Sequence, residues 1–116
     1  MKTTTFDVII VGGGLAGLTN AIHLSQFKQR VLLIEKKSYP KHKVCGEYIS
    51  NEVLPYLNSL GINPIKDGAK QISKVQVSTI KGNIIKGKLP LGGFGMSRYF
   101  LDSLLLRKAR FNGVQV

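Results

Sequence analysis

The sequence predicts an α/β fold with a parallel sheet, on three observations. An apolar, mostly β-branched run from Val8 to Val11 leads directly into the glycine-rich stretch Gly12 to Gly17. Apolar residues then recur at helical spacing. A second apolar run, Val31 to Ile34, ends on the acid Glu35. Strand, glycine turn, helix, strand and acid, in this order over residues 6–35, are typical of a dinucleotide-binding βαβ unit.

Each glycine of this Rossmann-type turn is expected to have its own role. Gly12 lets the chain turn sharply out of the strand, and Gly14 lets a pyrophosphate approach the backbone because it has no Cβ. Gly17 lets the helix pack closely against the sheet. The helix that begins at Leu15 and Ala16 would direct free N–H groups and its positive dipole end at the phosphates. The turn is therefore a predicted phosphate site.

The acid at the end of the second strand predicts which nucleotide is bound. Glu35 follows Gly14 by 35 − 14 = 21 residues, where a carboxylate can accept hydrogen bonds from both ribose hydroxyls. The same carboxylate would repel a 2′-phosphate, so an NADP-type ligand is disfavoured. Lys28 stands where a glycine usually ends the helix. A left-handed cap at Lys28 would be costly, and a longer turn through Gln29 and Arg30 could avoid it.

The remaining chain predicts further elements around this unit. Residues 36–50 contain Pro40 and Gly46 and read as a loop, and residues 51–61 read as a short helix capped by Ser50. Alternating apolar residues predict an inserted β-hairpin over about 72–89. The glycine-rich residues 91–95 are expected to be flexible. Residues 98–112 are expected to form a helix capped by Ser97, and a third strand is expected to start at Val114.

Composition excludes several classes of function. The 116 residues correspond to one domain, and no apolar run approaches the roughly 20 residues of a membrane span. Asp7 and the glycine run argue against a signal peptide, so we expect a cytoplasmic protein. The single cysteine, Cys45, excludes an intramolecular disulfide, and with two histidines there is no metal-ligand set. The formal net charge of +11 comes from scattered lysines, which favour a solvated surface over nucleic-acid binding.

Three segments together resemble a known family. They are the GGGLAG turn with Glu35, the loop PKHKVCGEYIS, and the helix MSRYFLDSLLLRKA that leads to Gly113 and Val114. The chain resembles the N-terminal, FAD-binding part of a flavoprotein oxidoreductase of the glutathione-reductase-like superfamily. Within it, the chain is most similar to aromatic-hydroxylase-type monooxygenases and geranylgeranyl-reductase-like enzymes. The resemblance covers nearly the whole chain but only about the first third of such an enzyme.

The resemblance implies a role for individual residues. Gly12, Gly14 and Gly17, with the helix start at Leu15 and Ala16, would hold the FAD pyrophosphate. Glu35 with Lys36 would border the adenosine ribose. Lys43 would lie along the FAD, Cys45 and Gly46 would approach the flavin side of the pocket, and Arg98 would contact a phosphate or the ribityl chain. The family more often has the sequence Cys-Gly-Gly at this point. In this chain Glu47 takes the place of the second glycine.

The predicted function is the FAD-binding portion of a flavin-dependent oxidoreductase that acts on an apolar organic substrate, with NAD(P)H or another donor as reductant. No residue can be nominated as a catalytic acid or base. Two alternatives remain open: an NAD-dependent Rossmann oxidoreductase and a basic nucleic-acid-binding module. The resemblance also implies a second flavin-contacting motif, an apolar strand that ends in Gly-Asp, far towards the C-terminus of such an enzyme. Because this sequence lacks it, we expect a truncated chain that is inactive alone. An open sheet edge predicts self-association.

Overall fold

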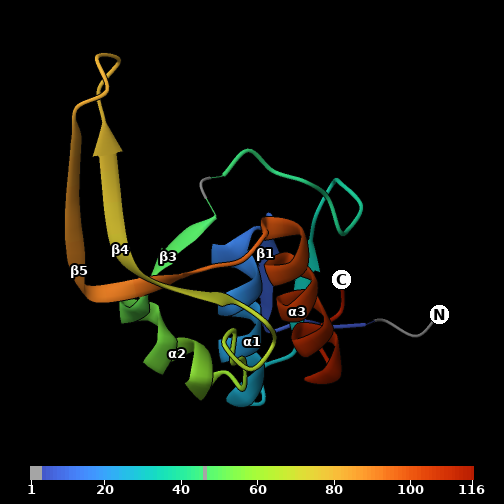
Figure 1. Ribbon diagram of the computed structural model, residues 1–116. Helices are drawn as coiled ribbons and strands as arrows, with labels where there is room; N and C mark the ends of the chain where they lie inside the picture. The colour runs from blue at the N-terminus through green and yellow to red at the C-terminus, as the bar shows by residue number, and fades with distance from the viewer. Residues whose placement is uncertain (1–3, 46) are drawn as a thin grey trace.

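The computed structural model describes residues 4–45 and 47–116 and contains a parallel and an antiparallel sheet (Figure 1). In the parallel sheet, β1 (Val8–Val11) pairs with β2 (Val31–Ile34), and α1 (Leu15–Gln26) connects them. On the other edge of β2, Gln115 forms a parallel bridge with Leu32. The predicted α/β class with a Rossmann-type βαβ unit is confirmed, and β2 is the central element of this sheet.

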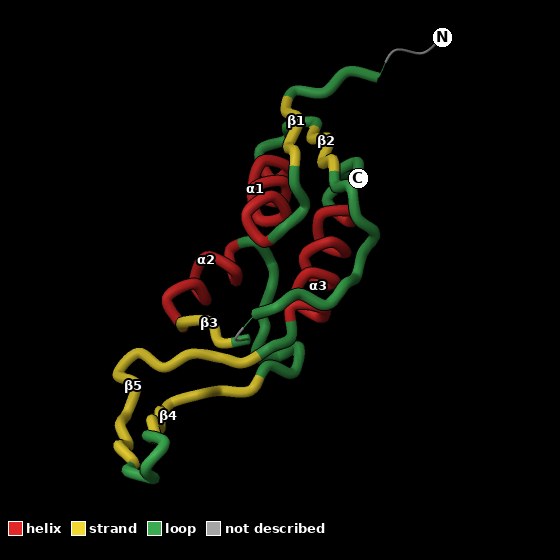
Figure 2. The backbone as a smooth tube through the Cα atoms, turned by 90° about the horizontal axis from the view of Figure 1, so that it is seen from above, coloured by secondary structure: helices red, strands yellow, loops and turns green. Residues whose placement is uncertain are grey.

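Helix α3 (Arg98–Phe111) packs beside α1, and together they cover one face of the parallel sheet (Figures 1 and 2). The helix begins where expected, because the Ser97 hydroxyl accepts a hydrogen bond of 3.2 Å from the Phe100 N–H. The fully buried apolar side chains that these elements share are Leu18, Ala21, Ile22, Val31, Leu33, Leu101, Leu105 and Ala109. This part of the core therefore holds the two helices against the sheet that carries the glycine turn.

The antiparallel sheet has the order β3–β5–β4, and its long hairpin projects away from the two helices (Figures 1 and 2). Its strands are β3 (Tyr48–Ser50), β4 (Lys70–Ser78) and β5 (Ile84–Gly95). The hairpin predicted over 72–89 is present but longer at both ends. The last three residues of the predicted 36–50 loop form β3.

The prediction that residues 91–95 are flexible is wrong, because they belong to β5. Gly93 to Gly95 pair with β3 on one side and with the start of β4 on the other. A Cβ on Gly93 would lie 2.5 Å from the backbone oxygen of Ile49, so the glycine allows a close approach that a side chain would block. Phe94, between the glycines, is fully buried. Two-sided pairing, rather than composition, decides the structure here.

The short helix predicted over 51–61 begins as a 3-10 turn, η1 (Asn51–Val53), and continues as α2 (Leu54–Ser59). The Ser50 hydroxyl accepts from the Glu52 N–H at 3.4 Å, as expected for a cap. Gly61 follows with a φ of +77°, which ends the helix.

Helix α1 ends in the left-handed cap. Lys28 has a φ of +61°, so the chain does not take the alternative, the longer turn through Gln29 and Arg30. The Lys28 N–H donates to the Ser25 carbonyl at 3.0 Å, and the Gln29 N–H donates to the Leu24 carbonyl at 3.3 Å. These bonds satisfy the last carbonyls of the helix and offset the cost of roughly 1–2 kcal/mol for a left-handed L-residue.

Candidate functional site

The glycine turn between β1 and α1 has a different geometry at each glycine. Gly12 has a φ of +107°, which strongly favours glycine. A Cβ on Gly17 would lie 1.8 Å from the Gly12 oxygen, so the helix can approach the turn only because Gly17 has no side chain. A Cβ on Gly14 would meet no atom within 4 Å. The protein leaves open space in front of Gly14, where a ligand could reach the backbone.

The N-terminus of α1 faces this space without a side-chain cap. Gly14 is its N-cap residue, and the first turn contains no acid. Because the first hydrogen bond of the helix runs from the Leu18 N–H to the Gly14 carbonyl, the N–H groups of Leu15, Ala16 and Gly17 have no partner within the helix. Helix α3, in contrast, is capped by Ser97. Free N–H groups and the helix dipole make the start of α1 suitable for an anion.

The carboxylate of Glu35 holds the glycine turn from the end of β2. Its two oxygens accept hydrogen bonds from the Gly13 N–H at 2.8 Å and from the Lys37 N–H at 2.9 Å. These two bonds lower the pKa of Glu35, with smaller contributions from the positive charges of Lys41 and Lys43. Each oxygen of the ionised group keeps further acceptor capacity, so Glu35 can hold the turn and still accept from a ribose.

Tyr39 also holds this turn, a contact that the sequence pattern did not predict. Its hydroxyl donates to the Gly13 carbonyl at 2.5 Å, so Tyr39 and Glu35 together hold both polar groups of Gly13. Burial raises the pKa of Tyr39 to about 12, and the negative charges of Glu35 and Asp102 act in the same direction. The phenol therefore stays a neutral donor at physiological pH. A lone aromatic residue in an aperiodic loop gives no pattern that would predict this contact.

A cavity of about 480 Å³ opens at the carboxyl end of β2, beside Glu35. Its apolar wall comes from β2, α3 and the end of the chain, and its polar rim carries Glu35, Lys37 and Arg110. The other lining residues are Leu32, Leu33, Ile34, Ser38, Tyr39, Leu106 and Val116. Because ligands of α/β proteins bind at the carboxyl ends of parallel strands, this cavity is a candidate site for the adenosine half of a dinucleotide.

Two of the predicted FAD contacts, Lys43 and Arg98, meet at one carboxylate, that of Asp102. The Arg98 Nε donates to Oδ1 of Asp102 at 3.1 Å, and the Lys43 ammonium group donates to Oδ2. Asp102 is 1% exposed, whereas both cations keep part of their side chains at the surface. The sequence pattern alone did not predict a role for Asp102. Its signal is an acid within an otherwise apolar helix stripe, between Leu101 and Leu104.

The remaining predicted residues lie outside this network. Lys36 and Cys45 are exposed, and Gly46 lies outside the described residues. Glu47 has a φ of +57°, which is the conformation that a glycine favours. The departure from the family's Cys-Gly-Gly pattern therefore leaves a glutamate in a conformation suited to the usual glycine. Its carbonyl accepts from the Met96 N–H at 3.1 Å and connects the loop to the chain before α3.

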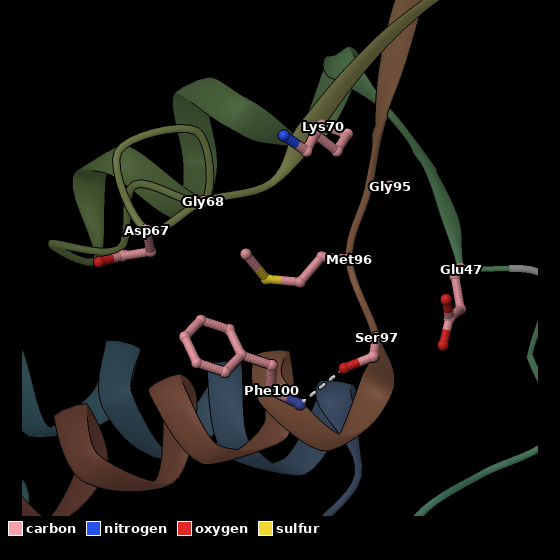
Figure 3. A pocket seen from close by; sticks show the side chains of 8 residues that line it. All are labelled: Glu47, Asp67, Gly68, Lys70, Gly95, Met96, Ser97 and Phe100. Atoms are coloured by element: carbon pink, nitrogen blue, oxygen red, sulfur yellow. Dashed lines mark hydrogen bonds between the residues drawn. The ribbon is translucent and has the colours of Figure 1, made fainter.

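A second cavity, of about 540 Å³, lies between the base of the hairpin and the start of α3 (Figure 3). The side chains of Met96 and Phe100 lie next to each other in it, and Asp67, Lys70 and Glu47 also line it. It contains none of the residues that the sequence predicted for the cofactor. It shares no lining residue with the glycine turn or with the cavity beside Glu35.

Within the described parts of the chain, no helix is long and apolar enough to cross a membrane. The same residues contain no group of three or more His, Cys, Asp or Glu side chains that could hold a metal ion.

Comparisons with known proteins identify relatives for this arrangement. A family model of FAD dependent oxidoreductases matches residues 7–45. Digeranylgeranylglycerophospholipid reductase 1 of Methanothermobacter thermautotrophicus is 32% identical over 100% of this chain and 30% of that protein. The structure of 2-methyl-3-hydroxypyridine-5-carboxylic acid oxygenase matches with a TM-score of 0.83 and 30% identity, over 97% of this chain and 31% of that one. A flavin-dependent brominase matches with a TM-score of 0.78 and 26% identity, over 97% and 29%.

The predicted resemblance is thereby confirmed in both sequence and fold: the chain is similar to part of the flavin-dependent oxidoreductases. It spans 26% of the length of the digeranylgeranylglycerophospholipid reductase of Sulfolobus acidocaldarius and 30% of that of M. thermautotrophicus.

Proposed function

We propose that this chain is the FAD-binding portion of a flavin-dependent oxidoreductase, and that residues 1–116 form part of its nucleotide-binding domain. One observation carries the proposal. The backbone at Gly14 borders open space at the uncapped start of α1, while Glu35 holds the neighbouring Gly13 N–H at 2.8 Å. An exposed anion site next to a carboxylate matches the two ends of an adenosine diphosphate group.

The residues of the site have complementary roles in this proposal. The N–H groups of Leu15, Ala16 and Gly17 bind the pyrophosphate, because they are free and lie at the positive end of the helix dipole. Glu35, bordered by Lys36, accepts from the ribose hydroxyls, and the cavity beside it takes the adenine against its apolar wall. Lys43 and Arg98 supply positive charge along the rest of the cofactor, and Cys45 with Gly46 borders its flavin side.

When bound, the flavin supplies the redox chemistry. We propose an apolar organic substrate and either oxygenation or double-bond reduction. An oxygenase and a digeranylgeranylglycerophospholipid reductase are both among the relatives. NAD(P)H is the proposed electron donor. The chain itself binds and orients the cofactor, and none of its side chains is assigned as the acid or base. Because it covers under a third of these relatives, we expect no turnover from the 116 residues alone.

Titrations with three ligands test the proposed function. FAD, NAD and a random DNA duplex are added separately to the purified chain, and flavin fluorescence, intrinsic tyrosine fluorescence and anisotropy are recorded. We expect saturable binding of FAD at one site. Binding of NAD with no binding of FAD would favour an NAD-dependent enzyme, and DNA binding that weakens steeply with salt would favour a basic nucleic-acid module. Either result in a folded chain contradicts the proposal.

We also propose that the chain self-associates through the open face and edge of the parallel sheet. Helices α1 and α3 cover one face, whereas Ile9, Val11 and Ile34 are 60%, 81% and 46% exposed on the strands. Exposed strands with apolar side chains favour association. Light scattering across a concentration series tests this, and a monomer at the highest concentration would contradict it. A cytoplasmic location, suggested by the sequence, stays a prediction.

A further inference from the structure

Asp102 is the only charged side chain that is buried in the described part of the chain. It lies in the second turn of α3 and is 1% exposed, and its helix neighbours Leu101, Leu104 and Leu105 are also buried. A buried carboxylate is costly unless positive groups compensate it. A residue that served only the packing of α3 at this position would be apolar, so the charge requires an explanation.

The two carboxylate oxygens hold two different cations. Oδ1 accepts from the Nε of Arg98, one turn earlier in the same helix, and Oδ2 accepts from the ammonium group of Lys43, which comes from the loop after β2. Asp102 and Lys43 are 59 residues apart in the sequence, so the contact ties the loop to the helix. The contact uses one of the five N–H donors of the guanidinium and one of the three of the ammonium. Donors therefore remain for another partner.

This cluster of three charges has a net charge of +1 and lies near the glycine turn. Lys43 is close enough for its charge to act on Glu35, and Asp102 is close enough to act on Tyr39. Both Glu35 and Tyr39 hydrogen-bond to Gly13. The side chains of Lys43 and Arg98 are 23% and 18% exposed, so their cationic groups can still reach a ligand.

We infer that Asp102 is a positioning residue, which fixes Lys43 and Arg98 in the orientation that receives the phosphate and ribityl part of FAD. The inference rests on the proposed FAD site. Long cationic side chains lose conformational entropy when they bind an anion, and a buried carboxylate that already holds them removes part of that cost. Asp102 thus acts on the cofactor through the two cations and does not touch it.

The test compares Asp102→Asn in two backgrounds. In the otherwise native chain, Asp102→Asn is expected to weaken FAD binding about 10- to 100-fold, as for the loss of charge-assisted hydrogen bonds. In a chain that already carries Lys43→Met and Arg98→Met, the same substitution is expected to change FAD affinity less than about twofold, because no cations remain to be positioned. Asp67→Asn, an exposed aspartate beside the second cavity, is the matched control and should leave the affinity unchanged.

The outcomes separate the inference from the proposed function. If the native chain does not bind FAD, both fail. If it binds FAD and Asp102→Asn binds equally well or more tightly, the positioning role is wrong while the FAD site stands. An equal loss in both backgrounds would make Asp102 merely structural and also contradicts the inference. If Asp102→Asn does not fold, Lys43→Met, Arg98→Met and their double variant are used instead. Because the two cations share one carboxylate, the losses of FAD affinity in the single variants should not add up to the loss in the double variant. Additive losses of FAD affinity would overturn the inference.

Discussion

The β1–α1–β2 unit with its glycine turn, together with α3, uses the same residue types in the opposite way to the projecting hairpin. Gly17, in α1, faces the backbone oxygen of Gly12 so closely that a Cβ would lie 1.8 Å from it, whereas a Cβ on Gly87, in the hairpin, would make an ordinary contact of 3.5 Å with Val75. Lys43 is paired with the buried Asp102, whereas Lys74 and Lys86 lie exposed on β4 and β5. A glycine or a lysine gains a specific role only where packing surrounds it.

The difference also shows in burial. No residue of β4 is buried, and Ile80 at the hairpin tip is fully exposed. The β1–α1–β2 unit and α3, in contrast, share a continuous core. We therefore expect substitutions in the β1–α1–β2 unit to affect both stability and ligand binding. Comparable substitutions in the outer part of the hairpin, residues 74–88, are expected to affect neither.

The largest expected effect is that of Gly17→Ala on folding. The new methyl group would overlap the Gly12 oxygen, so the turn or the helix must shift, at a cost of about 1–3 kcal/mol or more. Gly87→Ala, the hairpin control, should change the free energy of unfolding by less than about 0.5 kcal/mol. Urea denaturation of both variants measures this. Equal denaturation midpoints for the two variants would contradict the claim that Gly17 is closely packed and Gly87 is not.

Glu35→Arg is expected to have the next largest effect. It removes the acceptor for the ribose and places a positive charge at the end of β2, so FAD binding should weaken by about 1.5–3 kcal/mol, the range for a hydrogen bond to a charged group. Glu52→Arg, at an exposed acid on η1, controls for the change in net charge. Calorimetric titration with FAD gives both affinities. Unchanged binding in Glu35→Arg would exclude this carboxylate from the nucleotide site.

The sequence predicted the parts of the fold that depend on local periodicity and on glycine spacing. It predicted β1, α1, β2, α3 and the hairpin, because apolar period and turn residues are encoded within each segment. It did not predict the strand conformation of Gly93 to Gly95, which depends on pairing with two distant strands. The contacts of Tyr39 and Asp102 were missed for the same reason: their partners Gly13 and Lys43 lie 26 and 59 residues away in the sequence.

The smallest expected effect is a pH dependence from Tyr39. Its folded-state pKa of about 12 lies above the ordinary value of 10.0, so its contribution to stability is complete below pH 10 and is lost as the pH rises through 12. The loss should be modest, because the phenol is only partly buried and solvent screens its charge. Tyr39→Phe should show a shallower decline of unfolding free energy between about pH 10 and about pH 12. Parallel declines in the two proteins would contradict the assignment.

The most direct test of the central claim, that Gly14 marks the phosphate site, is a FAD titration of Gly14→Ala beside Gly87→Ala. Gly14 has a φ of −78°, and its Cβ would meet no protein atom within 4 Å, so the substitution should leave the fold intact. Only a ligand in that space would meet the new methyl group. We predict that Gly14→Ala keeps the native circular dichroism and melting temperature but loses FAD affinity at least about tenfold, while Gly87→Ala binds as the native chain does. Native FAD affinity in a folded Gly14→Ala chain would contradict the account.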